Sequence, residues 1–415
     1  MEIWQWTSII GVATWLIFSS HFNVTQKLRS HIQPWATLHV ITGTSFILKI
    51  QVPPYSRFAS FFLFNVINSD FYSQKWQNVY LDIFFSALSC VVSDPFYSAF
   101  LPLLFWSGHC KLARQMTLLM AFCDYLGNCV KDVVSAPRPH SPPVRRITAT
   151  KDEEAHASEY GLPSSHTLNT ICLSGYLYHY LLSQNDDISL KITGLALVCI
   201  FVTLIACGRI YLGMHSLIDI ICGLFLGLAI LSFWLRIHNQ VDNFIISDRN
   251  VTAFWFALSF LLHFAYPTPE NPSPSFEYHT AFNGVALGIV AGVQQTYNQY
   301  HHEAVPRAFT EIQFATFCLR MVIGIPTIVA VKFCTKAMAK SVLPSVANAL
   351  GIPIVSSSYL AALPKNKRST YFEKVFFFSK QESLDVDTGI RFLQYAGLAW
   401  AVVDLVPNLF TYAMI

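Results

Sequence analysis

The chain has 415 residues, of which 53% are apolar and only 12% are charged. Soluble domains carry about a quarter charged residues, so this shortage of solvating charge indicates that much of the surface faces lipid. The formal net charge of +3 is too small to indicate a nucleic-acid partner. The ten cysteines are scattered without a CxxC pair, which favours packing roles and indicates neither an oxidising nor a reducing compartment.

The first twenty residues lack a basic n-region and a small-residue cleavage site, so they are expected to form an uncleaved membrane segment. The stretch from residue 27 to 76 mixes one apolar run, at 35–50, with a polar, aromatic and proline-containing part at 51–77, and no structure is predicted for it. A spanning helix needs about 20 mostly apolar residues. Candidate spans cover residues 81–106, 116–134, 167–182, 192–206, 217–235, 251–266, 281–291, 315–333 and 392–409. Residues 336–384 are expected to form a long extramembrane connection.

A first polar stretch closes the second of these spans and contains Lys131, Arg138 and two prolines. Pro137 and Pro139 are expected to end the helix and to hold Arg138 in an extended turn. A guanidinium and an ammonium aimed at one point suit a phosphate. The alternative for these two side chains is that they only extend to the membrane interface.

A second polar stretch places Ser164, Ser165 and His166 where the third span begins. The free backbone N–H groups and the positive dipole end of a helix bind anions there. Either serine could instead be an ordinary N-cap. An imidazole just inside a span is unusual unless it meets a polar partner.

A third polar stretch joins the fourth and fifth spans and contains Arg209, His215 and Asp219. His215 and Asp219 are four residues apart and share a face on a helix. Asp219 is therefore predicted to accept the Nδ1–H of His215, which would leave Nε2 free to attack. Two spans separate the second stretch from the third, so all three stretches are expected to open on one side of the membrane.

The combined pattern K-x6-RP, PSxH and R-x5-H-x3-D resembles the signature of the type 2 phosphatidic acid phosphatase superfamily. Ser165 is the one visible variation, since many members have glycine there. The stretches around Lys131, at 141–146 and at 160–166, and Arg209 to Asp219, look like the sphingosine-phosphate (long-chain-base phosphate) phosphatase branch. The resemblance covers roughly residues 80–235.

This resemblance implies an all-α, polytopic transmembrane bundle with a six-helix lipid phosphatase core and extra C-terminal spans. The expected division is an N-terminal membrane region at 1–78, a catalytic core at 79–240 and an additional transmembrane region at 241–415. The implied reaction dephosphorylates a sphingoid long-chain-base phosphate through a phosphohistidine. Another lipid phosphate, such as phosphatidate, lysophosphatidate or a polyprenyl diphosphate, is the alternative. A transporter is a third interpretation, which is disfavoured because the sequence shows no internal repeat of the kind that many transporters have.

The resemblance also implies the role of each site residue. His215 would be the nucleophile, oriented by Asp219, and His166 the general acid and base. The phosphoryl oxygens would be bound by Lys131, Arg138, Ser164, Ser165 and Arg209. Three cations would repel a metal ion and can supply its charge, so no cofactor and metal-independent activity are expected. The expected partners are the lipid phosphate substrate and the membrane, and the oligomeric state stays open.

Sidedness follows from the basic residues in the loops. The side opposite the site carries Lys111, Arg114, Lys191, Arg236 and Arg249, whereas the site's side carries Arg145, Arg146 and Lys151 besides the site residues. The count weakly favours a cytosolic opposite face. Because members of the resembling branch are typical of the endoplasmic reticulum with lumenal sites, a multi-pass protein of that membrane with a lumenal site is expected.

Overall fold

The computed structural model describes residues 2–51, 78–148, 154, 157, 159–184, 186–247, 250–271, 273–302, 313–352, 354–356 and 384–414. The architecture is helical, as predicted, and the strands among these residues are the two-residue parallel pair β1 (Ile354–Val355) and β2 (Leu384–Asp385). Residues 52–77, which belong to the stretch for which no structure is predicted, lie outside the described residues.

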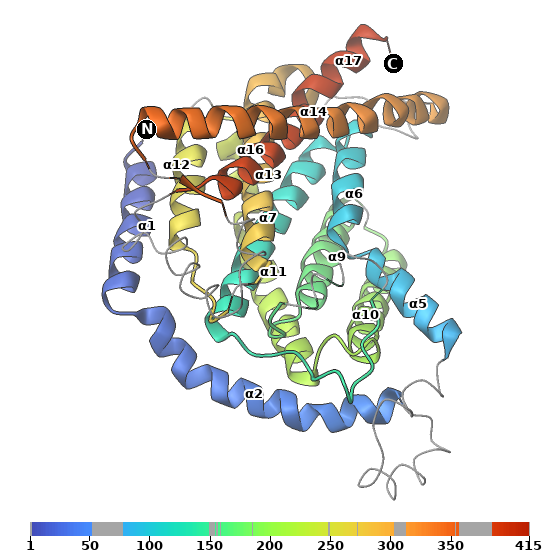
Figure 1. The fold of residues 1–415 in the computed structure, drawn as a ribbon. Coiled ribbons are helices and arrows are strands. Elements are labelled where there is room, and N and C mark those ends of the chain that lie inside the picture. The colour runs from blue at the N-terminus through green and yellow to red at the C-terminus, as the bar shows by residue number, and fades with distance from the viewer. Residues whose placement is uncertain are drawn as a thin grey trace, which may run out of the picture.

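Six helices between residues 78 and 247 lie next to one another (Figure 1). They are α5 (Val79–Cys90), α6 (Asp94–Trp106), α7 (Cys110–Val134), α9 (Ser165–Gln184), α10 (Ile188–Tyr211) and α11 (Leu217–Ile245). Helices α7, α9 and α11 are at the centre of the described bundle. Helix α7 packs against α6, α9 and α11, and its polar side chains face protein. Arg114 near its start, for example, is buried and forms an ion pair with Asp242 of α11.

The C-terminal region packs on this centre through α13 (Ser275–Thr296), which contacts α7 on one side and α16 (Val386–Trp400) on the other. Helix α12 (Val251–Ala265) and the π-helical turn η2 (Tyr297–His301) flank α13. The described chain ends with α14 (Phe314–Ala349), α16, the π-helical turn η4 (Ala401–Leu405) and α17 (Val406–Tyr412).

Four helical segments of the described chain are long and apolar enough to cross a membrane, namely α10, α11, α14 and the segment Val386–Tyr412. A fifth span results if α5 and α6 are counted together. Helices α7, α9 and α13, which were also candidate spans, fall short of this criterion because they carry polar residues toward their neighbours, and many of those residues are buried. The chain is a multi-pass membrane protein with lipid-facing helices around a more polar interior.

The predicted span over residues 81–106 is not one continuous helix. The helix breaks after Cys90 and resumes at Asp94, and the segments Val79–Cys90 and Pro95–Trp106 are bent by 48° relative to each other. Pro95 lies in the first turn of α6, where a missing N–H costs nothing, but it cannot continue a preceding helix. The break places Cys90, Val92 and Ser93 beside the interior of the bundle.

In the first part of the predicted extramembrane connection at 336–384, α14 continues as a helix to Ala349. Leu343 of α14 lies against Gly389 of α16, so packing between the two helices extends α14 past the apolar run. Residues 357–383 of that connection lie outside the described residues.

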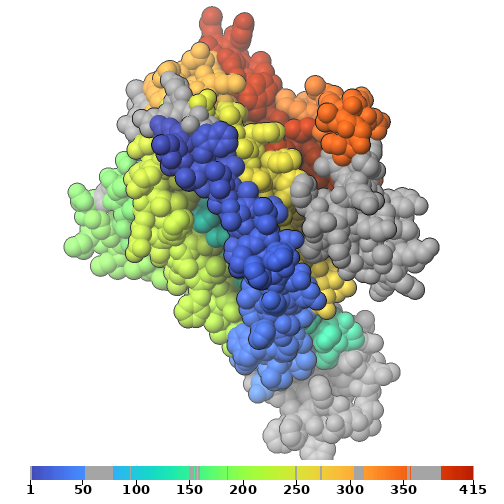
Figure 2. Space-filling model, turned by 90° about the vertical axis from the view of Figure 1, so that its left-hand side faces the viewer, coloured from blue at the N-terminus to red at the C-terminus, as the bar shows by residue number. Residues whose placement is uncertain are grey.

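The N-terminal helices α1 (Ile3–His21) and α2 (Val24–Gln51) lie along the outside of the bundle (Figures 1 and 2). Helix α2 crosses the end where α7 stops and α9 begins, and Arg29 donates to the carbonyl of Asp132 at 2.9 Å. At its other end, Gln51 donates to the carbonyls of Tyr211 and Arg145, each at 2.8 Å. Neither α1 nor α2 is among the helices that meet the spanning criterion, although 1–78 was expected to hold a membrane segment.

Candidate active site

A cavity of about 920 Å³ lies among α6, α7, α9 and α13, and its polar end lies at the three predicted stretches. Six of the predicted site residues line it: Lys131, Arg138, Ser165, His166, Arg209 and His215. Two others, Ser164 and Asp219, are absent from the described residues that line the cavity. Its walls are largely apolar and aromatic, with Phe96, Leu101 and Phe105 of α6 facing Phe282 and Ile289 of α13.

His215 lies in the turn between α10 and α11 and is only 2% exposed. Its Nδ1 is 3.0 Å from the carbonyl oxygen of Gly161, and its Nε2 is 3.0 Å from a guanidinium nitrogen of Arg138. A carbonyl can only accept and a guanidinium can only donate, so Nδ1 carries the proton and Nε2 carries the lone pair. This is the tautomer that a histidine nucleophile requires.

Asp219 does not hold the Nδ1–H of His215 as predicted. Its Oδ2 is 3.7 Å from Nδ1, and the same oxygen accepts the backbone N–H of Ser216 at 2.7 Å as part of the capping box of α11. The Gly161 carbonyl takes the predicted place because the Gly161 backbone packs tightly here. A Cβ on Gly161 would lie 3.1 Å from both Asp219 Oδ2 and the Pro137 carbonyl, so glycine permits the close approach.

Three buried cations surround the polar end of the cavity: Lys131, Arg138 and Arg209. Burial lowers the pKa of Arg138 to about 10, with a further contribution from the positive charge of Arg209. Burial, and then the charges of Arg138, Arg209 and Lys131, hold the pKa of His215 well below its ordinary value. The imidazole is therefore neutral at pH 7, and the surrounding charge is suited to an anion.

The two serines of the second stretch have different positions. Ser164 is fully buried, and its hydroxyl accepts a hydrogen bond from the Thr167 hydroxyl at 3.1 Å, while its backbone N–H donates to the Asp219 carbonyl. Ser165 begins α9, lines the cavity and accepts from Lys131 Nζ at 2.8 Å. Ser164 thus ties α9 to α11, and Ser165 is the serine that faces the cations.

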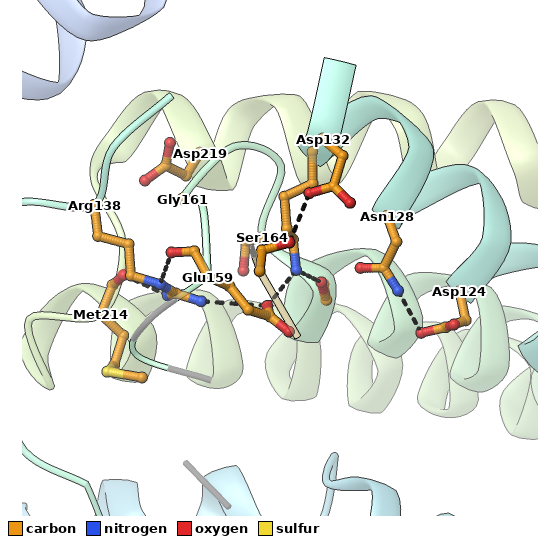
Figure 3. Close-up of polar contacts among 12 residues, drawn as sticks. Asp124, Asn128, Asp132, Arg138, Glu159, Gly161, Ser164, Met214 and Asp219 are labelled. Atoms are coloured by element: carbon orange, nitrogen blue, oxygen red, sulfur yellow. Dashed lines mark hydrogen bonds and ion pairs between the residues drawn. The ribbon is translucent and has the colours of Figure 1, made fainter. Parts of the chain in front are cut away.

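Glu159, for which the sequence predicts no role, lies among these cations. Its carboxylate accepts from Lys131 Nζ at 2.5 Å and lies 3.6 Å from Arg138, and its backbone carbonyl accepts from Arg138 Nε. Figure 3 shows the Glu159 side chain directed toward Arg138. Its one signal in the sequence is its place just before the second motif. That signal is weak, because a glutamate in a polar loop is usually solvated.

A family model for the PAP2 superfamily matches residues 112–242. The chain is 58% identical to a lipid phosphate phosphatase delta of Arabidopsis thaliana, over 99% of this chain and 96% of that protein. It is 26% identical to a dihydrosphingosine 1-phosphate phosphatase of Schizosaccharomyces pombe, over 81% and 84% of the two chains. It is 25% identical to a sphingosine-1-phosphate phosphatase 1 of Rattus norvegicus, over 77% and 69%.

No solved structure matches the chain. The family match covers α7 to α11, which carry all three polar stretches. The relative in Arabidopsis thaliana extends the similarity over both terminal regions. The chain is a lipid phosphate phosphatase and belongs to the PAP2 superfamily.

Proposed function

We propose that this enzyme dephosphorylates sphingoid long-chain-base phosphates through a phosphohistidine on His215. The observation that carries the proposal is the buried imidazole of His215. Its Nδ1–H bonds to the Gly161 carbonyl, and its Nε2 contacts Arg138 in a cavity that Lys131 and Arg209 also line. An apolar cavity leads away from that imidazole, so a lipid tail can be accommodated beside the reacting group.

In the first step Nε2 of His215 attacks phosphorus, and the bond from phosphorus to the lipid oxygen breaks. His166, which lines the same cavity, donates a proton to that oxygen, so the lipid leaves as a neutral alcohol. Lys131, Arg138, Arg209 and Ser165 bind the phosphoryl oxygens. Phosphoryl transfer depends chiefly on such positioning and charge stabilisation.

In the second step a water attacks the phosphohistidine and the P–N bond breaks. His166, now neutral, accepts a proton from this water, and inorganic phosphate leaves with His215 restored. Asp219 supports the phosphohistidine indirectly in this proposal, because it caps α11 and its carboxylate lies 3.7 Å from Nδ1. Ser164 likewise has a positioning role in this proposal, since its hydroxyl accepts the backbone N–H of Thr167 in the first turn of α9.

The reaction is proposed to need no metal. Lys131, Arg138 and Arg209 line the cavity beside His215, and these three cations would repel a metal ion and can stabilise the charge that builds up on the equatorial oxygens. Activity that is lost on chelation and restored by Mg²⁺ would contradict this.

The substrate class is supported by the printed names of relatives, among them dihydrosphingosine and sphingosine 1-phosphate phosphatases. The more similar relative in Arabidopsis thaliana is named only for lipid phosphate, so another lipid phosphate is the alternative substrate. We also propose that the protein resides in the endoplasmic reticulum membrane with the site facing the lumen.

The test is phosphate release by the purified protein from sphingosine phosphate, phosphatidate and a polyprenyl diphosphate, with and without chelator. His215→Ala is the inactive control. We expect sphingosine phosphate to be preferred and ³²P from labelled substrate to remain on the quenched wild-type protein in an acid-labile form. Full activity of His215→Ala would refute the mechanism, and preference for phosphatidate would refute the substrate class.

A further inference from the structure

Hydrogen-bond acceptors line the cavity directly beyond the proposed phosphate site. Asp124 and Asn128 of α7 lie on the same face as Lys131, and all three line the cavity. Lys131 lies seven positions after Asp124, a distance of two helical turns or about 10 Å along the helix. The Asn128 amide donates to Asp124 Oδ1 at 2.9 Å, so the carboxylate points along α7 toward the phosphate end, as Figure 3 shows.

Asn169 of α9 adds another acceptor from the facing helix. It lines the cavity and is 7% exposed, and its Oδ1 has no hydrogen-bond partner among the described residues. The helices are close here, because a Cβ on Gly127 of α7 would lie 3.4 Å from Leu168 of α9. Gly127 and Leu168 directly precede Asn128 and Asn169, so both asparagines lie at one level of the cavity. A buried acceptor without a donor is costly, and a ligand donor would satisfy it.

We propose that Asp124 and Asn169 bind the ammonium and hydroxyl groups of the long-chain base, and so select it over other lipid phosphates. This inference rests on the proposed function. A long-chain-base phosphate carries its ammonium on the second carbon and a hydroxyl on the third, both donors within a few bonds of the phosphate. Phosphatidate offers ester carbonyls at the same places, which only accept and would meet other acceptors.

The other acids that line the cavity fit this task less well. Glu159 already lies between Lys131 and Arg138, in the position proposed for phosphate. Glu277 is largely exposed and forms an ion pair with Arg391 of α16. Asp124 lines the cavity two turns of α7 before Lys131, so it can meet the head of a lipid whose phosphate lies at the cations. A carboxylate inside a membrane bundle typically marks a substrate path.

The experiment compares Asp124→Asn with wild type on sphingosine phosphate and on its N-acetyl derivative, which keeps the chain, hydroxyl and phosphate but has no ammonium. We expect kcat/KM for sphingosine phosphate to fall about 10-fold to 100-fold. For the N-acetyl substrate we expect it to change by less than about twofold. Asn169→Leu, which removes the acceptor and keeps the volume, should reduce kcat/KM for both substrates, since both keep the hydroxyl. Glu277→Gln, the same acid-to-amide change in the same cavity, is the control and should leave both substrates unaffected.

A second readout needs no catalysis, namely binding of phosphate-free sphingosine and N-acetylsphingosine to the folded protein. Weaker binding of sphingosine alone by Asp124→Asn supports the proposal. An equal loss for both ligands, or no loss, overturns it even if the wild type is an active phosphatase. If the wild type binds sphingosine selectively through Asp124 but releases no phosphate, the head-group site stands and the proposed function fails.

Discussion

Glu159 places a negative charge where the proposed mechanism needs a phosphoryl group. Its carboxylate contacts Lys131 and lies within ion-pair distance of Arg138, and its side chain is 2% exposed. Three buried cations would repel one another without such a partner. The substrate phosphate must therefore compete with Glu159 for these two cations.

Replacing Glu159 by Gln should make the site bind inorganic phosphate more tightly. Without the competing carboxylate, we expect the inhibition constant of phosphate to fall by about tenfold. The measurement is product inhibition at constant pH, with Glu277→Gln as the control because that acid lines the same cavity but forms its ion pair with Arg391. An unchanged or larger inhibition constant for Glu159→Gln would show that the carboxylate does not occupy the phosphate position.

The lowered pKa of His215 predicts how the stability of the protein depends on pH. In the unfolded chain this histidine takes up a proton as pH falls through about 6.5, whereas the buried imidazole stays neutral. The unfolded state then binds more protons, so the folded state loses stability as pH falls below 6.5. At pH 5.5 the loss from this one group is about 1 kcal/mol.

His215→Asn should remove that part of the pH dependence. We expect the thermal unfolding midpoint in detergent to fall less for this variant than for wild type between pH 7.5 and pH 5.5. All other histidines are common to both proteins and cancel in the comparison. Parallel curves would mean that His215 titrates normally in the folded protein.

At the scale of elements, the close packing of α13 on α16 stands out. Gly284, Gly288 and Gly292 recur at four-residue intervals on one face of α13, and α16 or η4 lies against each of them. Small residues at this spacing allow membrane helices to approach closely, which gains packing without a hydrophobic driving force. This repeat was visible in the sequence and could have predicted the α13 interface, which forms one wall of the cavity.

Gly288→Ala should therefore destabilise the protein by about 1–3 kcal/mol. The added Cβ would meet the Ala396 carbonyl and would lie 2.9 Å from the Ala399 Cβ. The readout is the thermal midpoint of the purified protein. Gly11→Ala in α1 is the matched control, because nothing lies within 4 Å of a Cβ there and alanine favours helix. Equal midpoints for the two variants would contradict the close contact.

For the whole molecule, the orientation in the membrane is predicted by comparing the basic residues at the end of the bundle that carries the site with those at the opposite end. The charge count that favours a lumenal site loses one residue, because Arg114 is 1% exposed and forms an ion pair with Asp242, so its position serves packing. The remaining excess of basic residues on the side opposite the site still agrees with a lumenal site. The division at residues 78 and 240 also stays a prediction.

Protease protection in sealed microsomes tests the orientation. A tag inserted at residues 150–152, between the first two motifs, should be protected. A tag between α9 and α10 should be cleaved, because α9 runs from the site to the opposite end of the bundle. The reversed pattern would place the site on the cytosolic side.

The membrane class, the helical fold and the residues that gather around His215 can all be predicted from composition and motif spacing. Motif spacing sufficed because two spans between the second and third stretches return the chain to the same side. The ionisable groups of the three stretches could be predicted to share a site, because such groups in a membrane bundle need partners. They are Lys131, Arg138, His166 and Arg209, and Ser165 lies beside them.

The contacts between these groups become apparent only in the folded molecule. The contact between the Gly161 carbonyl and His215 could not be predicted, because a backbone oxygen carries no residue-type signal. Glu159 pairs with Lys131 across 28 residues because a loop folds back into the site. Two further features could not be predicted because they depend on the neighbours that face them. They are the break between α5 and α6 and the buried acceptor of Asn169. Residue types and their order are local properties, whereas partners and cavities depend on the packing of segments distant in sequence.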